Sequence, residues 1–475
     1  MFDAFAPLVR EAKARGACLR IGTNHGSLSD RMMWKYGDTI EGMVESALEY
    51  LRVCEAENFD QVVFSMKSSN PRVVVEAYRL LAARLDRGHK PYPFHVGVTE
   101  AGDGEDGRLK SAVGIGALLL DGIGDTVRVS LTEDPVQEIP VARALVALCD
   151  PARLPACPSL EESLDFYAVQ RRPTAVVHLG GLAVGGREKV AVGAPDPGAE
   201  TLPKGERRLE WLTTPDSHTL REGIATVWEP GTVNFAIATA HDLVALSSGL
   251  ILGGVSDLPR QLEIVVADPA HLDRLPPEVL GLPQLFWSCA PAANLVARYR
   301  YLAAWLARRG RPDPVILRGG SDGTPEGNML CAAQLGSLLV DGIGDLIHIS
   351  GPLGARTAMH LGFDVLQSAG VRKTKPEYVA CPSCGRTLFD LQTTTQKIRQ
   401  RTAHLKNISI AIMGCIVNGP GEMADADFGY VGGAPSKVNL YVGRDCVQKN
   451  IPEEEAPEAL VNLIKEHGRW IEPGG

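Results

Sequence analysis

Three cysteines in the last quarter of the chain are spaced for metal chemistry. Cys381 and Cys384 stand three positions apart in CPSCGRTLFD, and Cys415 follows an apolar run that predicts a strand from 408 to 413. Three thiolates suit an iron–sulfur cluster in which one iron is left for a weaker oxygen ligand. Glu422, seven residues after Cys415 and at the end of the glycine-rich turn NGPGE, is the nearby oxygen donor.

The same cysteines leave other kinds of site open. A zinc site needs a fourth Cys or His, but His404 precedes the predicted strand and Cys446 belongs to a different loop. The sequence also has no second Cys-x-x-Cys pair. A redox thiol pair and plain buried cysteines are further alternatives. The spacing therefore favours an iron–sulfur cluster and keeps zinc as the main alternative.

A second group of polar side chains stands on predicted strands of the first 130 residues. It supplies cations together with hydroxyl and amide donors: Arg20, Asn24, Lys67, Arg128 and Ser130. These are the groups that clamp a phosphate or diphosphate. Glu100 does not fit an anion site, so we expect it to exchange a proton, with burial raising its pKa and the cations lowering it. A structural salt-bridge network is the alternative interpretation.

These side chains need a scaffold of strands that alternate with helices. Short β-branched or apolar runs predict strands at 18–24, 60–67, 94–100 and 125–130. Helical patterns lie between them at 39–54, behind a threonine cap, and at 73–85. This alternation predicts an α/β fold with parallel strands, in the manner of a TIM-type barrel. Four such units make half of a barrel, because the complete barrel has eight.

A repeat relates the first part of the chain to its middle. Residues 112–130, AVGIGALLLDGIGDTVRVS, match residues 332–350, AAQLGSLLVDGIGDLIHIS, at an offset of 220, and 77–96 matches 298–317 at an offset of 221. By this alignment, Lys67, Glu100, Arg128 and Ser130 correspond to Ser288, Gly320 or Ser321, His348 and Ser350. Only the serine is kept. We therefore expect the chemistry to reside in the first copy.

The predicted organisation has three domains. Residues 1–150 form the carboxy-terminal half of a catalytic (β/α) barrel, 151–372 a barrel-like insert domain, and 373–475 a small α/β iron–sulfur domain. Within the insert, 186–215 includes APDPGAETLPKGERR and lacks apolar periodicity, which predicts an exposed loop.

Composition narrows the classes of partner. The 475 residues include 45% hydrophobic and 22% charged side chains, enough for more than one core. A net charge of -9 disfavours nucleic acid. The sequence lacks an apolar run of the roughly 18 residues that a membrane-spanning helix needs. Ten cysteines, mostly single and in apolar surroundings, do not resemble a secreted disulfide framework, so we expect a reducing cytoplasm.

Several motifs resemble one family in combination. They are CPSCGR with MGCIVNGPGE, RIGTNHGSLSD, FSMKSSNP, GVTEAGDGEDGRLKSAVGIG and DGIGDTVRVSLTEDP. Together they resemble the 4-hydroxy-3-methylbut-2-en-1-yl diphosphate synthases of the non-mevalonate isoprenoid pathway, over residues 20–135 and 376–435. The middle third resembles the insert of the three-domain, plant-like form, a second barrel without catalytic duty.

The resemblance implies a cofactor and a set of roles. A 4Fe-4S cluster is held by Cys381, Cys384, Cys415 and Glu422, with Asn418 beside it. Contacts to the diphosphate come from Arg20, Asn24, Lys67, Arg128 and Ser130, and Glu100 is the acid–base residue.

The implied activity is the reductive ring opening and dehydration of 2-C-methyl-D-erythritol 2,4-cyclodiphosphate, with electrons from reduced ferredoxin or flavodoxin. A zinc-dependent barrel hydrolase and a non-catalytic small-phosphate-binding protein are the alternatives. Members of this family have further amino-terminal strands that contribute substrate contacts. We therefore expect this chain to be a fragment of a longer protein or to have a misassigned start, and a barrel completed in some unfamiliar way is the alternative.

Overall fold

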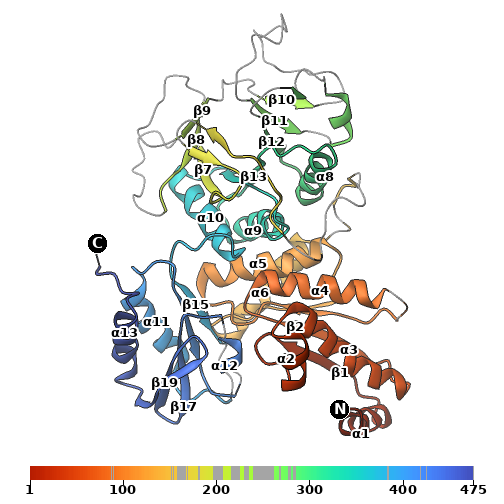
Figure 1. Ribbon diagram of the computed structural model, residues 1–475, viewed down its shortest axis with the longest axis vertical. Helices are drawn as coiled ribbons and strands as arrows, with labels where there is room; N and C mark the ends of the chain where they lie inside the picture. Colours follow the sequence, from red (N-terminus) through yellow and green to blue (C-terminus); the bar gives the residue numbers. More distant parts are fainter. Residues whose placement is uncertain are drawn as a thin grey trace, which may run out of the picture. The chain divides into compact units, whose positions relative to one another are not determined.

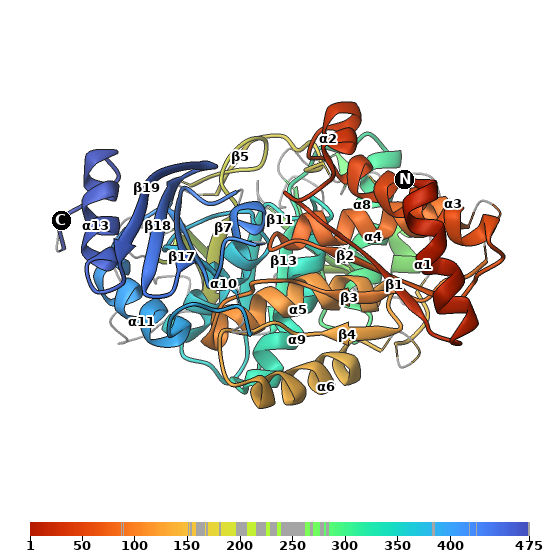
Figure 2. The ribbon, with the colours of Figure 1, turned by 90° about the horizontal axis from the view of Figure 1, so that it is seen from below.

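Four parallel strands form the sheet of residues 1–149 in the computed structural model (Figures 1 and 2). They are β1 (Leu19–Asn24), β2 (Val62–Lys67), β3 (His95–Gly97) and β4 (Thr126–Arg128). β1 pairs with β2 and β3 pairs with β4, and a bridge between Phe64 and Phe94 joins the two pairs. Strand order follows chain order, as in half of a (β/α)8 barrel. The predicted partial barrel is confirmed.

Helices connect these strands and pack on one face of them. They are α1 (Phe2–Ala14), α2 (Asp30–Tyr36), α3 (Ile40–Ala56), α4 (Pro71–Leu85), α5 (Gly104–Leu120), η1 (Pro135–Gln137) and α6 (Glu138–Leu148). The Thr39 hydroxyl caps α3 by accepting a hydrogen bond from Gly42 N, and Asn70 caps α4 just before Pro71. α3 packs on β1 and β2, α4 on β2, and α5 on β3.

The other face of the strands, the inner face, carries polar and small residues. In β1, Ile21 and Thr23 are buried, whereas Arg20 and Gly22 are exposed on the opposite side. Arg128 at the end of β4 is exposed as well. The interior of a complete (β/α)8 barrel is packed mainly with branched apolar side chains. The inner face of this half barrel is therefore suited to binding rather than to packing.

A five-stranded mixed sheet forms the carboxy-terminal part of the chain. Its strands are β15 (Glu377–Ala380), β16 (Ser409–Met413), β17 (Phe428–Ala434), β18 (Lys437–Val442) and β19 (Asp445–Pro452). β15 to β17 are parallel, and β17 to β19 are antiparallel. Helices α11 (Leu391–Thr402) and α13 (Ala456–Glu466) pack in the core on one face. The strand predicted at 408–413 is confirmed, but NGPGE, predicted as a turn, ends in one helical turn, α12 (Gly419–Glu422).

The middle of the chain forms a second array of parallel strands. They are β7 (Ala191–Pro195), β8 (Trp211–Thr214), β9 (Ala225–Trp228), β10 (Phe235–Ala238), β11 (Leu262–Val266), β12 (Leu285–Cys289), β13 (Ile316–Gly320) and β14 (Leu346–Ser350). Pairing runs from β10 through β14 and on to β7, β8 and β9, with a bridge between Trp287 and Val315 joining β12 to β13. The last strand thus pairs with the first, as barrel closure requires. The predicted barrel-like insert is confirmed.

The remaining elements of this insert are helices and a hairpin. They are β5 (Val177–Leu179), β6 (Leu182–Val184), η4 (Pro269–Arg274), α8 (Leu295–Arg308), α9 (Pro325–Val340) and α10 (Ala355–Ser368). The order α8, β13, α9, β14 repeats the order α4, β3, α5, β4, which confirms the repeat.

Two predictions for the insert are wrong. The described part of 186–215 is not an exposed loop, because β7 and β8 lie in it and Val192 and Ala194 are buried. Residues 196–206, which make up most of APDPGAETLPKGERR, lie outside the described residues. A strand buried on both faces is a short apolar run without alternation, which a search for periodicity misses. The alignment of Lys67 with Ser288 is also wrong. The bridges at Phe64 and Trp287 are equivalent, so Ser65 corresponds to Ser288.

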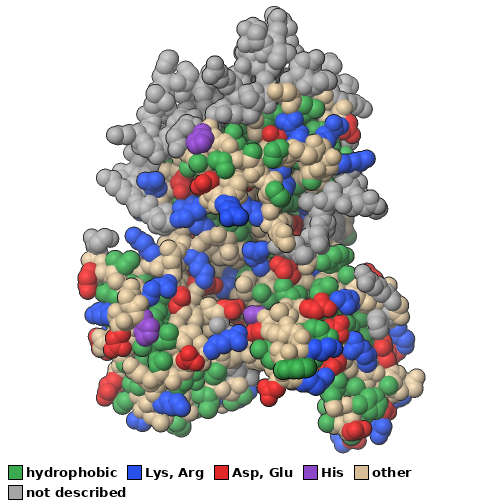
Figure 3. Space-filling model, viewed as in Figure 1, with side chains coloured by type: hydrophobic (Ala, Val, Ile, Leu, Met, Phe, Trp, Pro, Cys, Tyr) green, Lys and Arg blue, Asp and Glu red, His purple; other side chains and the backbone are tan. Residues whose placement is uncertain are grey.

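The chain divides into two compact units, one of residues 1–149 with 373–475 and one of residues 150–372. The structure describes all residues except 87, 89, 151, 153, 158–166, 168–169, 180–181, 196–206, 215–224, 229–234, 239–261, 267–268, 276–279, 282–284, 382–384, 418, 424 and 474–475. No helix in the described part is long and apolar enough to cross a membrane. On the face drawn in Figure 3, lysine and arginine side chains are interspersed with acidic ones.

Candidate functional site

Three strands of the half barrel deliver polar side chains to one level of the inner face. Asn24 ends β1 and lies opposite Lys67, which ends β2. Arg128 ends β4 and lies opposite Gly97 of β3. Gly97 has no side chain, and a Cβ there would stand 2.5 Å from the Arg128 carbonyl oxygen. The register therefore brings one amide and two cations together around an open position.

Glu100 follows β3 in an uncommon backbone conformation. Its φ is +49°, in the left-handed region that non-glycine residues other than Asn and Asp seldom adopt. The side chain is 4% exposed, and its Oε2 atom has no hydrogen-bond partner. Strained residues with unsatisfied buried groups cluster at functional sites. Glu100 has both features.

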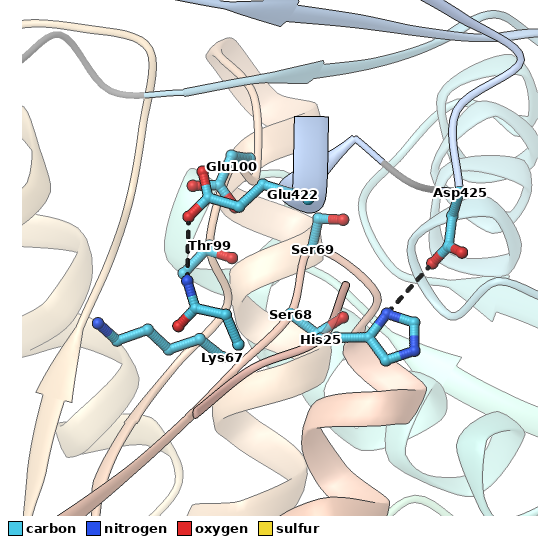
Figure 4. A pocket seen from close by; sticks show the side chains of 10 residues that line it. His25, Lys67, Ser68, Ser69, Thr99, Glu100, Glu422 and Asp425 are labelled. Carbon is cyan, nitrogen blue, oxygen red and sulfur yellow. Dashed lines mark hydrogen bonds and ion pairs between the residues drawn. The ribbon is translucent and has the colours of Figure 1, made fainter. Parts of the chain in front are cut away.

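Glu422 reaches the same place from the carboxy-terminal part of the unit. It ends α12, and Asn24 Nδ2 donates a hydrogen bond of 3.3 Å to Glu422 Oε1. The preceding Gly421 allows this approach, since a Cβ there would lie 2.0 Å from Ser27 Oγ. Figure 4 shows the carboxyl groups of Glu100 and Glu422 next to each other, with Lys67 and Thr99 nearby.

The electrostatics of the three charged groups follow from burial. Burial raises the pKa of Glu100 to about 8, and the neighbouring Glu422 carboxylate adds to the rise. Burial also raises the pKa of Glu422, although Lys67 acts in the opposite direction. Burial lowers the pKa of Lys67, and the charges of Arg20 and Arg128 lower it further. Two adjacent buried carboxyl groups cannot both ionise easily, so this pair retains a proton near neutral pH.

Several polar contacts hold the carboxy-terminal part against the half barrel. Lys110 Nζ lies 2.8 Å from Glu377 Oε1, and Thr132 Oγ1 donates to the Ala380 carbonyl at 3.0 Å. Burial raises the pKa of Glu377, but Lys110 and Lys373 lower it more, to about 2. This ion pair, with Lys110 9% and Glu377 24% exposed, links α5 to β15.

Contacts on the Glu422 side complete the attachment. Arg444 Nη2 lies 2.8 Å from Asp38 Oδ2, and His25 lies between Asp38 and Asp425 at 3.7 Å from each (Figure 4). These contacts join the loop after β1 and the turn between α2 and α3 to the segments that follow α12 and β18.

A cavity of about 220 Å³ brings the predicted metal ligands and the predicted substrate contacts together. Its lining includes Cys381, Cys415 and Glu422 on one side and Lys67, Asn24, Glu100 and Arg128 on the other. Thr99 and Arg386, which the sequence did not single out, line it too.

The thiol side of this cavity suits a bound cluster in its donor chemistry. The backbone amide of Gly414 donates a hydrogen bond of 3.2 Å to Cys381 Sγ, a contact that stabilises a cluster-bound thiolate. Among the described residues, no three His, Cys, Asp or Glu side chains converge to hold a single metal ion. A cubane does not need such convergence, because each of its irons takes its own ligand around the cluster. The residues present therefore fit an iron–sulfur cluster.

The other predicted ligands have different outcomes. Cys384 and Asn418 lie outside the described residues. His404 and Cys446 were considered as zinc ligands. His404 Nε2 lies 2.7 Å from the Ile471 carbonyl oxygen, and Cys446 Sγ lies 3.8 Å from the Gln448 carbonyl oxygen. Neither of these two residues lines the thiol cavity.

A second cavity, of about 270 Å³, lies on the inner face next to the first. It is lined by Arg20, Ser65, Lys67, His95, Val96, Gly97, Val98, Thr99 and Arg128. Arg20 is thus brought together with Lys67 and Arg128 here. Ser130 lines neither cavity; it is fully buried, and its hydroxyl has no hydrogen-bond partner. His95 was missed from the sequence, although the alternation of 95, 97 and 99 along FHVGVTE places it on the inner face.

Two family models match the chain. Residues 2–143 match the GcpE TIM-barrel domain, and residues 377–466 match the GcpE protein C-terminal domain. Three relatives bear the name 4-hydroxy-3-methylbut-2-en-1-yl diphosphate synthase (flavodoxin). The protein of Chlorobaculum tepidum is 40% identical over 99% of this chain and 72% of its own length. The proteins of Akkermansia muciniphila and Parabacteroides distasonis are 44% and 43% identical, over 99% of this chain and 75% and 77% of their own lengths.

Proposed function

The chain belongs to the 4-hydroxy-3-methylbut-2-en-1-yl diphosphate synthase family, and we propose that it converts 2-C-methyl-D-erythritol 2,4-cyclodiphosphate to (E)-4-hydroxy-3-methylbut-2-enyl diphosphate. The protein is an oxidoreductase of isoprenoid biosynthesis. The observation that carries the reaction is the 220 Å³ cavity, because thiols and a carboxylate line one side of it while two cations and a second carboxyl group line the other.

The thiol side would hold the cofactor. Cys381 and Cys415, with Cys384 and Glu422, are the proposed ligands of a 4Fe-4S cluster. When bound, the cluster supplies electrons to the substrate, one at a time. Glu422 is the exchangeable ligand, because a carboxylate oxygen binds iron more weakly than a thiolate does. Its hydrogen bond from Asn24 gives the carboxylate a second resting place on the barrel side. Asn418 is proposed to lie beside the cluster.

The cationic side would hold the diphosphate. Arg20, Lys67 and Arg128 converge on the cavity next to the thiols, and Asn24 of the first cavity is the proposed neutral contact. Ser130 lines neither cavity, so its contact with the diphosphate stays a prediction from the sequence. Burial of Lys67 among other cations makes its charge costly without an anion. Binding a diphosphate removes that cost, so affinity and orientation arise from the same contacts.

Glu100 would manage the proton. The overall change breaks the bond between C2 and a phosphate oxygen, with the electron pair staying on that oxygen. Two electrons enter, the hydroxyl of C3 takes up a proton, and it departs as water while C2 and C3 become doubly bonded. Glu100 lines the cavity with an unpaired carboxyl oxygen, so it is placed to protonate the leaving hydroxyl.

The electrons come from a partner protein. The relatives are named for flavodoxin, and we propose reduced flavodoxin as the donor, with ferredoxin as the alternative. The insert of residues 150–372 is proposed to have no catalytic duty. A reducing compartment, the cytoplasm, suits a protein whose described cysteines form no disulfide.

Anaerobic reconstitution with iron and sulfide tests this function. We expect iron and sulfide rather than zinc in the purified protein, and conversion of the cyclodiphosphate when reduced flavodoxin is added. Glu422→Ala should retain much of the visible absorption of the cluster, since three thiolates remain, and should lose turnover. Zinc without sulfide would instead favour a hydrolase. Colourless Glu422→Ala protein would contradict the ranking of the ligands.

A further inference from the structure

His95 lies on the floor of the cationic cavity. It starts β3 and lies opposite Thr126 of β4, one level below the Gly97–Arg128 pair. Ser65 of β2 shares this level, as the adjacent bridge between Phe64 and Phe94 shows. The cavity of about 270 Å³ above them includes both side chains in its lining. His95 therefore faces the space in which three cations converge.

One hydrogen bond orients the imidazole of His95, and another holds the backbone that carries it. Nδ1 of His95 and the Thr126 hydroxyl share a hydrogen bond of 2.7 Å. The His95 carbonyl accepts a hydrogen bond of 2.5 Å from the Tyr78 hydroxyl of α4. A hydroxyl can donate to or accept from Nδ1, so Thr126 accommodates both the neutral and the protonated ring. Nε2 is left as the ring nitrogen available to a ligand.

The charges around His95 are all positive. Arg20 on β1, Lys67 on β2 and Arg128 on β4 face it, and none of the nine residues that line this cavity is acidic. Burial lowers the pKa of His95, and these three cations lower it further. An anion in the cavity would reverse the electrostatic effect of the cations, because its charge favours the imidazolium.

The two cavities divide the substrate between them. They share Lys67, Thr99 and Arg128, but only the first contains the thiols and only the second contains Arg20 and His95. A ligand that spans both places its carbon skeleton beside Cys381 and Cys415 and its diphosphate above His95. This division rests on the proposed function.

We propose that His95 is a ligand of the substrate diphosphate, to which its Nε2–H donates a hydrogen bond, and that it takes up a proton from solvent when the diphosphate binds. Ring opening leaves the electron pair of the broken carbon–oxygen bond on a phosphate oxygen, so the diphosphate gains one negative charge. The imidazolium offsets that charge. His95 therefore supports binding of the substrate and stabilises the product diphosphate more strongly.

Calorimetry without reductant tests the proton uptake. The cyclodiphosphate is suitable because each of its phosphorus atoms carries one strongly acidic oxygen, so that its charge does not change between pH 6 and 8. For the wild type we expect the affinity to rise by up to roughly tenfold for each pH unit between pH 8 and pH 6, since one proton is taken up on binding. His95→Gln should remove most of that rise and bind more weakly at pH 6. Titration of Glu100 affects both proteins equally, so the difference between them isolates His95.

Two further measurements separate a binding role from a structural one. In protein labelled with 15N-histidine, the resonances of His95 are the ones that disappear in His95→Gln. Adding inorganic pyrophosphate to the wild type should move these resonances to the chemical shifts of an imidazolium. Thr126→Val leaves the imidazole but removes its Nδ1 partner, so it should weaken the affinity for the cyclodiphosphate at pH 6 by a smaller factor than His95→Gln. The melting temperature of each variant checks that the half barrel remains folded.

The outcomes distinguish this proposal from the proposed function. If the wild type neither binds nor converts the cyclodiphosphate, the proposed function fails. If the wild type does both and His95→Gln keeps the same pH dependence of affinity, the assignment of His95 is overturned and the function stands. An unshifted His95 resonance at saturating pyrophosphate would also overturn it.

Discussion

The two copies of the repeat share side-chain hydrogen bonds and an ion pair at equivalent positions. Tyr78 donates its hydroxyl to the carbonyl of His95, and Tyr299 does the same to the carbonyl of Ile316. Asp125 accepts a hydrogen bond from Phe94 N at 2.8 Å, and Asp345 accepts one from Val315 N at 2.9 Å. The ion pairs Arg79–Asp121 and Arg300–Asp341 are both 2.8 Å long. These contacts connect strands and helices without touching the inner face, so they belong to the scaffold.

The copies differ on the inner face. The register sets Gly97 and Arg128 of the first copy against Arg318 and His348 of the second. A charged side chain therefore fills the position that Gly97 leaves open. In the first copy Gly97 lines the second cavity, and its neighbour Arg128 lines both cavities.

The copies also differ in length after β3. Ala101 N donates to the Ser130 carbonyl, and Ser321 N donates to the Ser350 carbonyl, so Ala101 and Ser321 are equivalent. Three residues separate Gly97 from Ala101, whereas two separate Arg318 from Ser321. Glu100 therefore has no counterpart, which corrects its alignment with Gly320 or Ser321. Its left-handed backbone accommodates the extra residue, and the chemistry resides in an insertion rather than in the shared frame.

The largest effect on turnover is expected when Glu100, the inserted residue, is replaced by a side chain without an acidic proton. Glu100→Gln keeps the shape of the side chain but cannot donate a carboxyl proton, so we expect kcat to fall by roughly 10²- to 10⁴-fold. The affinity for the cyclodiphosphate should change by less than about threefold, and calorimetry measures it. Gly320→Ala is the matched control in the second copy, since a Cβ there meets its nearest atom at 3.7 Å. Wild-type turnover in Glu100→Gln would remove Glu100 from the reaction.

Breaking the shared ion pair should destabilise either copy. Arg79→Ala removes the ion-pair partner of the mostly buried Asp121, at a cost of up to about 3–5 kcal/mol. Arg300→Ala should cost at least as much, because the Asp341 side chain that it leaves behind is 1% exposed and that of Asp121 is 12%. Hydrogen exchange of the helices in each unit measures the loss locally. Arg79→Ala should loosen α4 and α5, and Arg300→Ala should loosen α8 and α9. Equal protection in variant and wild type would contradict the scaffold role.

Substitutions of Arg128 in the first copy and of the equivalent His348 in the second should differ in their effect on the affinity for the cyclodiphosphate. Arg128→Gln removes charged hydrogen bonds to the diphosphate, worth about 1.5–3 kcal/mol, and this is roughly a 10- to 150-fold loss of affinity. His348→Gln changes the equivalent position of the second copy and should leave the affinity for the cyclodiphosphate unchanged. A similar loss in both variants would mean that the insert takes part in binding.

The sequence predicts the strands, the half barrel and the repeat of this protein better than it predicts the local features of the site. The strand positions, the half barrel and the repeat follow from apolar runs and from self-similarity, which are local properties. The left-handed backbone of Glu100 depends on how three residues join β3 to α5, and no residue type announces it. His95 was not predicted because it is the first residue of β3, whereas the predicted site residues were sought at the carboxyl ends of strands. Cys384 and Asn418 stay predictions, since both lie outside the described residues.

The smallest expected effect is a pH dependence confined to the second copy. Burial lowers the pKa of His348 to about 3, and Arg318 contributes to the fall. The folded state therefore keeps this imidazole neutral, while the unfolded chain protonates it near pH 6.5. Because the unfolded state binds more protons, stability is full above that value and falls as the pH decreases toward the folded pKa.

One pH unit below the unfolded value, at pH 5.5, this loss amounts to about 1.4 kcal/mol. His348→Gln does not titrate, so its urea midpoint relative to the wild type should improve between pH 7.5 and pH 5.5. An unchanged difference between the two midpoints would mean that His348 is protonated, or accessible to water, in the folded insert.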